Sequence, residues 1–115
     1  LKLVLLECGA GWIGYWLDRL DGVATATHLG NRVPLKLRPS DYFRRQVWIS
    51  GDPDERTLPA MMATYGADRF FWASDYPHPD HTGDYLQALE EMVDAVPAPA
   101  RAGLLGGNVR RAFGF

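Results

Sequence analysis

The sequence contains a single cysteine, Cys8, so no disulfide bond can form within the chain. We expect Cys8 to be a small buried residue, because no histidine or lysine lies near it in the sequence to activate the thiol. The apolar runs are only a handful of residues long, far too short to cross a membrane. Lysine and arginine number 12 against 14 aspartates and glutamates, so there is no basic excess for binding nucleic acid or an anionic membrane.

The remaining composition is typical of one folded domain. The chain has 115 residues, of which 47% are hydrophobic and 23% charged, and we expect a single domain over residues 1–115. No signal peptide is visible, because Lys2 and Glu7 interrupt the first apolar run, so we expect a cytoplasmic protein. The chain begins with Leu1 inside that run, which is typical of a sequence cut from a longer one.

Three short apolar runs predict the strands of a parallel sheet. They cover residues 3–6, 47–49 and 70–73, and glycine or proline follows each run within a few residues. None of the runs alternates with polar residues. Each strand is therefore expected to be covered on both faces, as the strands of parallel sheets are.

Helical patterns lie between these runs. The expected helices cover residues 13–20, 40–43, 57–65, 86–96 and 108–113, with Ser40 and Asn108 as N-caps and with Val109 and Phe113 docked on the core. Residues 24–39 are expected to form a long loop. Strands that alternate with helices predict an α/β fold with right-handed crossovers. A closed (β/α)₈ barrel needs roughly 250 residues, so about three such units cannot close one.

Carboxylates follow all three predicted strands. Glu7, Asp52 and Asp75 come just after the strand ends, and parallel strands place their carboxyl ends on one rim. Clustered carboxylates repel one another, which raises their pKa values or attracts a cation, and hard oxygen ligands suit a divalent metal. Two simpler explanations stay open: Asp52 could cap the following helix, and Glu7 could pair with an arginine.

Asp75 is the strongest of these candidates. It ends the most apolar strand and opens a loop that Pro77 and Pro79 stiffen. His78 and His81 follow in the same loop, but two histidines separated by a proline are weak evidence for a metal site. We expect His78, more than His81, to belong to the site.

A glycine-containing turn follows the first predicted strand. Residues 9–11 read GAG, which favours a tight connection from strand to helix. A phosphate-binding loop for a nucleotide is an alternative, although the full glycine fingerprint is absent. Trp12 could pack under this turn or line the wall of a pocket. His28 is expected at the surface.

Three segments resemble the amidohydrolase superfamily in its amidohydrolase-2 branch, which includes metal-dependent hydrolases and aminocarboxymuconate-semialdehyde-type decarboxylases. Residues 71–78 (FWASDYPH) are similar to the family's last-strand signature, and residues 104–114 (LLGGNVRRAFG) are similar to its terminal helix. Residues 7–12 (ECGAGW) resemble the loop after its sixth strand. The resemblance covers essentially the whole chain.

The resemblance implies the C-terminal part of a TIM barrel, with strands six to eight. It implies that Asp75 is a metal ligand and proton acceptor, and that Glu7, His78 and Trp12 contact a small-molecule substrate. The implied cofactor of the intact protein is zinc or manganese. The family's His-x-His pair on strand one and its strand-five ligand lie outside this sequence, so we expect the chain alone to bind little or no metal.

The first hypothesis for function is therefore the C-terminal part of a metal-dependent hydrolase that acts on a small polar or aromatic substrate. A metal-dependent non-oxidative decarboxylase of the same branch is an alternative, and so is a non-catalytic module that self-associates. We expect the isolated chain to lack activity. We also expect a homo-oligomer, because part of a barrel leaves unpaired strand edges and apolar surface.

Overall fold

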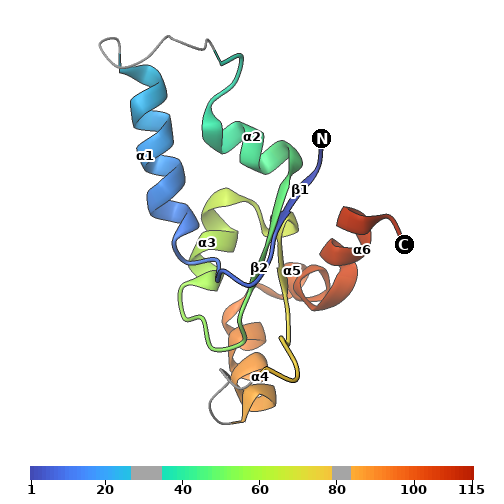
Figure 1. The fold of residues 1–115 in the computed structure, drawn as a ribbon. Helices are drawn as coiled ribbons and strands as arrows, with labels where there is room; N and C mark the ends of the chain where they lie inside the picture. Colours follow the sequence, from blue (N-terminus) through green and yellow to red (C-terminus); the bar gives the residue numbers. More distant parts are fainter. Residues whose placement is uncertain (27–34, 79–83) are drawn as a thin grey trace.

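The computed structural model describes residues 1–26, 35–78 and 84–115 (Figure 1). Its sheet consists of β1 (Leu3–Leu5), β2 (Val47–Gly51) and β3 (Phe70–Trp72) in the order β1-β2-β3. Both pairs are parallel, with Leu5 opposite Ile49 and Ile49 opposite Phe70. The α/β prediction with three parallel strands is confirmed.

Six α-helices were found in the described residues, and two irregular helical turns accompany them. The α-helices are α1 (Ile13–Thr25), α2 (Pro39–Gln46), α3 (Leu58–Tyr65), α4 (Tyr85–Ala95), α5 (Ala98–Ala102) and α6 (Asn108–Phe113). A 3₁₀ turn, η1 (Ala67–Arg69), precedes β3, and a π-helical turn, η2 (Gly103–Gly107), joins α5 to α6. The bounds expected for the loop, 24 and 39, are wrong, because α1 continues to Thr25 and α2 begins at Pro39. Residues 27–34, which include His28, lie outside the described residues.

Strands β2 and β3 are covered on both faces, as their continuous apolar runs predict, whereas Leu3 of β1 is 46% exposed. Ile49 and Phe70 point to the face that packs on α1 and α3. Their partners there include Ile13, Leu58 and Met62. Alternate strand residues point to the opposite face. There Trp48 and Phe71 pack on Ala112 of α6. Figure 1 shows α1 and α3 on one side of the sheet and α6 on the other.

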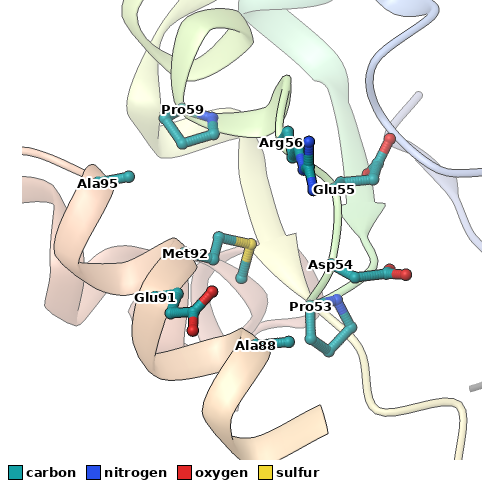
Figure 2. Close-up of a pocket in the computed structure, with 9 residues that line it drawn as sticks. All are labelled: Pro53, Asp54, Glu55, Arg56, Pro59, Ala88, Glu91, Met92 and Ala95. Atoms are coloured by element: carbon teal, nitrogen blue, oxygen red, sulfur yellow. The ribbon is translucent and has the colours of Figure 1, made fainter. Parts of the chain in front are cut away.

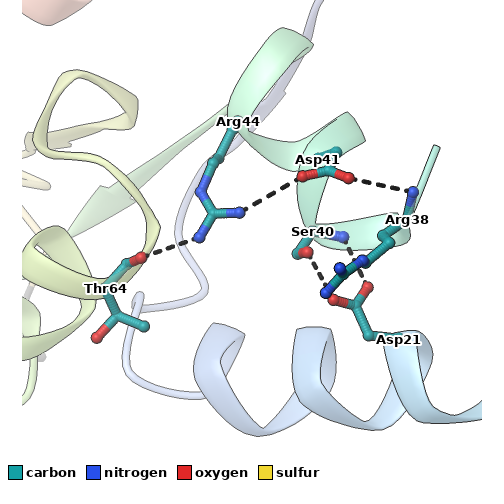
Figure 3. Close-up of polar contacts among 6 residues, drawn as sticks. All are labelled: Asp21, Arg38, Ser40, Asp41, Arg44 and Thr64. Atoms are coloured by element: carbon teal, nitrogen blue, oxygen red, sulfur yellow. Dashed lines mark hydrogen bonds and ion pairs between the residues drawn. The ribbon is translucent and has the colours of Figure 1, made fainter.

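The start of α2 is fastened to α1 by a carboxylate. Asp21 accepts hydrogen bonds from the Ser40 backbone N–H (2.9 Å) and the Ser40 hydroxyl (2.6 Å), as Figure 3 shows. The expectation that Ser40 is the N-cap is wrong, because the helix begins at Pro39 and its cap is Arg38. Ser40 is buried inside the first turn and uses its hydroxyl to contact another helix.

Arg44 joins α2 to α3. Its guanidinium donates to the carbonyl of Thr64 (3.1 Å) and lies 3.6 Å from Asp41, as Figure 3 shows. The guanidinium also sits 5.7 Å above the Tyr65 ring. The Tyr65 hydroxyl in turn lies 2.8 Å from Asp18 Oδ1, to which it donates. These bonds hold α1, α2 and α3 as one layer against the sheet.

The C-terminal helix is anchored by a buried amide. Asn108 is 1% exposed and donates to the carbonyls of Ala67 (2.7 Å) and Phe70 (2.6 Å). Asn108 therefore does not cap the helix as expected. Val109 packs on the sheet as predicted, but Phe113 is 54% exposed and stacks on Phe115. The buried stripe is centred on Asn108 and Ala112, four residues apart, which leaves Phe113 at its edge.

Candidate active site at the carboxyl edge of the sheet

The three predicted carboxylates follow strand ends that share one edge. Glu7 comes two residues after β1, Asp52 directly after β2, and Asp75 three residues after β3. The strands run in the same direction and are in register. Neighbouring strands lie about 4.8 Å apart, so roughly 10 Å separates the ends of β1 and β3. The edge is thus narrow enough for one small molecule to lie between the loops that follow these two strands.

Two of these carboxylates have an unusual backbone. Glu7 has φ 54° and Asp75 has φ 48°, and they are the two non-glycine residues in the described part of the chain with positive φ. This left-handed conformation costs about 1–2 kcal/mol for a residue with a Cβ. Such strain gathers at functional sites, where the surrounding structure maintains it.

Asp75 and His78 face each other across a tight turn. The distance from Asp75 Oδ2 to His78 Nδ1 is 3.8 Å, and their side chains are 31% and 53% exposed. The backbone closes the turn, because the N–H of His78 donates to the carbonyl of Asp75 at 2.7 Å. The spacing of three residues therefore produces a contact in a loop without any helix. His81 lies outside the described residues.

Glu7 is exposed, and its carboxylate makes no hydrogen bond or ion pair with the part of the chain that the structure describes. The alternative that Glu7 pairs with an arginine is therefore not seen there. Its exposed oxygens can accept hydrogen bonds from a ligand.

Trp12 packs under the turn, and part of its indole ring stays exposed to solvent. Its Nε1–H donates to the carbonyls of Cys8 (2.9 Å) and Gly9 (3.0 Å), while 40% of the residue stays exposed. The ring centroid lies 5.5 Å from that of Trp16. Because the indole N–H is occupied, Trp12 can offer a ligand its ring but no hydrogen bond.

Cys8 is exposed, so the expectation of a buried residue is wrong. It lies in the loop after β1. Partial desolvation raises the pKa of the thiol, and the negative charges of Asp52 and Glu55 raise it further, although a hydrogen bond with Trp12 opposes them. The thiol is therefore kept in its protonated, less nucleophilic form.

Sequence reasoning missed Glu55. Its carboxylate accepts hydrogen bonds from the backbone N–H groups of Ala10 and Gly11, at 2.8 Å each, and of Asp52 at 3.3 Å. The alternative of a phosphate loop is thereby weakened, because two of the turn's N–H donors are already satisfied. Asp52 and Glu55 are three residues apart, which is the spacing of a capping box. That spacing indicates the local hydrogen bond between them, but it gives no sign of the hydrogen bond to Ala10.

Asp52 does not cap α3, because the cap position is Thr57. The Asp52 N–H donates to the Glu55 carboxylate, and the Asp52 carbonyl accepts a hydrogen bond from the Glu55 N–H at 3.1 Å. Asp52 therefore begins a tight turn at the carboxyl edge.

Asp75 is the predicted residue whose side chain has the chemistry of a metal ligand. Asp75 supplies a partly exposed carboxylate, which is the ligand type that divalent cations prefer. No group of three histidine, cysteine, aspartate or glutamate side chains that could hold an ion was found among residues 1–26, 35–78 and 84–115. Asp75 by itself therefore has the chemistry of a single ligand.

A groove of about 490 Å³ lies between the loop after β2 and helix α4 (Figure 2). It is lined by Pro53, Asp54, Glu55, Arg56, Pro59, Ala88, Glu91, Met92 and Ala95. None of the predicted site residues lines it. The Glu55 carboxylate turns away from α4 toward the loop after β1. The groove is therefore separate from the candidate site.

No helix in the described part of the chain is long and apolar enough to span a membrane. None of the curated proteins searched matches the chain.

Several solved structures are similar to the chain. An amidohydrolase from Mycobacterium avium subsp. paratuberculosis matches with a TM-score of 0.80 and 21% identity, over 100% of this chain and 28% of that one. The 5-carboxyvanillate decarboxylase LigW from Sphingomonas paucimobilis matches with a TM-score of 0.73 and 33% identity, over 99% of this chain and 34% of that one. LigW2 from Novosphingobium aromaticivorans, a 5-carboxyvanillate decarboxylase solved with bound manganese, matches with a TM-score of 0.72 and 22% identity, over 99% and 33%.

The chain spans about a third of the length of these structures, because it covers between 28% and 34% of each. Its three parallel strands and their helices match part of a TIM-barrel-type fold. The family model described as Amidohydrolase, which is the amidohydrolase-2 branch, matches residues 1–115. The chain therefore belongs to the amidohydrolase family.

Proposed function

We propose that this chain is the C-terminal part of a metal-dependent decarboxylase that acts on a small aromatic carboxylic acid. The observation that carries the proposal is the pair of strained carboxylates, Glu7 and Asp75, at one edge of the sheet. The chain that holds them is 33% identical to LigW over 99% of this chain and 34% of LigW. Decarboxylation is favoured over hydrolysis because solved relatives are named as decarboxylases of aromatic acids.

Asp75 would hold a divalent metal together with ligands from the rest of the barrel, and manganese is favoured over zinc because relatives were solved with it. The ion would supply a positive charge that binds the acid and stabilises negative charge as CO₂ leaves.

The chain's own side chains have complementary roles. His78 would contact the substrate beside Asp75, because its Nδ1 lies 3.8 Å from Asp75 Oδ2. Glu7 can accept a hydrogen bond from a phenolic hydroxyl, because its oxygens are exposed and unpaired among the described residues. The exposed ring of Trp12 can pack against the ring of an aromatic substrate, because stacked and edge-to-face contacts between aromatic rings are favourable.

The test uses a longer protein in which these residues are joined to the rest of a barrel. We expect manganese-dependent release of CO₂ from 5-carboxyvanillate or a related hydroxybenzoate, with none from the 115-residue chain. Asp75→Asn should lower the rate by about 100-fold or more. The control Asp94→Asn should not, because Asp94 is 79% exposed and pairs with Arg101.

Hydrolysis of an amide or ester by the same protein, lost in Asp75→Asn and without release of CO₂ from any aromatic acid, would replace this proposal with the hydrolase hypothesis.

We also propose that the 115-residue chain self-associates. In the described residues β1 and β3 each have one neighbour in the sheet, so each has an unpaired edge. Leu3 and Leu6 at the β1 edge are 46% and 53% exposed. Light scattering at several concentrations should give a mass above that of the monomer, and a constant monomer mass would contradict the proposal.

A further inference from the structure

We infer that Glu55 is a positioning residue: its carboxylate holds the loop after β1, and with it Glu7 and Trp12, at the carboxyl edge of the sheet. The inference rests on the proposed function in one respect, namely that Glu7 and Trp12 contact the substrate. The structural part stands on hydrogen bonds in the described chain.

The first step is the number of donors that converge on this carboxylate. Oε1 accepts from the N–H of Ala10 and of Gly11 at 2.8 Å, and Oε2 accepts from Ala10 at 2.8 Å and from Asp52 at 3.3 Å. Hydrogen bonds from backbone N–H groups to an ionised carboxylate are stronger than neutral ones. One side chain thus joins the loops that follow β1 and β2, across 45 residues of sequence.

The second step is the close packing around the carboxylate. A Cβ on Gly9 would lie 3.0 Å from Glu55 Oε1, and a Cβ on Gly51 would lie 3.0 Å from Oε2. At both positions the backbone comes close to the carboxylate, and glycine leaves room for this approach. Gly9 also has φ 61°, which favours glycine. The loop is shaped around an anion at this point.

The third step connects the loop to the site. Ala10 and Gly11 lie between Glu7, which follows β1, and Trp12, which is the N-cap residue of α1. The Trp12 indole donates to the carbonyls of Cys8 and Gly9 in the same loop. Fixing Ala10 and Gly11 therefore limits how far Glu7 and Trp12 can move relative to Asp75.

The experiment uses ¹⁵N-labelled 115-residue chain and three variants. In Glu55→Ala we expect the amide signals of Ala10 and Gly11 to lose their downfield shift and to exchange with solvent roughly tenfold faster or more. The Glu7 amide and the Trp12 indole signals should move with them. Glu55→Gln fills the same space without the charge and should give the same changes in smaller size. Asp54→Ala, at the neighbouring exposed residue, should leave these signals in place.

Anion rescue separates positioning from a general loss of structure. Sodium acetate offers the same carboxylate, so it should return the Ala10, Gly11 and Trp12 signals of Glu55→Ala toward their original positions. Sodium chloride at equal ionic strength should not. The inference is overturned if Glu55→Ala folds with these signals unchanged, or if chloride restores them as well as acetate does. If Glu55→Ala does not fold, unchanged signals in Glu55→Gln overturn it. These signals do not depend on CO₂ release, so a failed decarboxylase assay leaves this test intact.

Discussion

Replacing Asn108 by alanine should destabilise the chain more than any single surface change. The amide donates to the carbonyls of Ala67 and Phe70 at 2.7 and 2.6 Å, in a site that is 1% exposed. Removing it leaves two buried acceptors without this donor, each worth about 1–3 kcal/mol. We therefore expect the free energy of unfolding to fall by roughly 2–4 kcal/mol, because relaxation recovers part of the loss.

Urea denaturation measures this change. The midpoint should fall while the slope of free energy against urea stays the same, since the surface exposed on unfolding is unchanged. Arg110→Ala is the matched control, because Arg110 lies on the same helix and is exposed. It should change stability by no more than about 0.5 kcal/mol. A loss below about 0.5 kcal/mol in Asn108→Ala would refute the claim that this amide anchors α6.

Two further predictions concern the helical layer. Burial, and then the hydrogen bond to Asp18, raise the pKa of Tyr65 above its ordinary 10.0. The neutral phenol therefore stabilises the fold below pH 10, and this stability should be lost as the pH rises through the raised pKa. Urea midpoints on either side of pH 10 should show the loss, and Tyr65→Phe should show less of it; equal losses would contradict the assignment. Asp21→Ala should cost about 0.5–2 kcal/mol, as for a lost helix cap, and should not be additive with Ser40→Ala. Additive losses would show that the two residues do not act together.

The sheet could be predicted from the sequence because its strands are continuous apolar runs, two of which, β2 and β3, are covered on both faces. Burial on both faces leaves continuous apolar runs, and those runs can be read without knowing their partners. The parallel direction then follows from the helices between them, and the shared edge of Glu7 and Asp75 follows from the parallel direction. These steps depend on residues that are close in sequence.

Several errors arose where a contact joins distant segments. Ser40 and Asn108 are residue types that cap helices, but Asp21 and the Phe70 carbonyl bind them instead. Glu55 was missed for the same reason, because its partner Ala10 lies 45 residues away. The positive φ of Asp75 could not be predicted from the sequence either, because positive φ is usually expected at glycine and not at aspartate.

The most direct test of the account is where manganese binds on the chain. Substoichiometric Mn²⁺, added to a ¹⁵N-labelled longer protein that joins these residues to the rest of a barrel, should broaden amide signals most strongly around Asp75, next at Asp52 and Glu7 on the same edge, and least at Val47, where β2 begins. Asp75→Asn should remove this pattern. Broadening centred on the acidic residues of α1 or α4, or a pattern unchanged in Asp75→Asn, would contradict the placement of the site at the carboxyl edge.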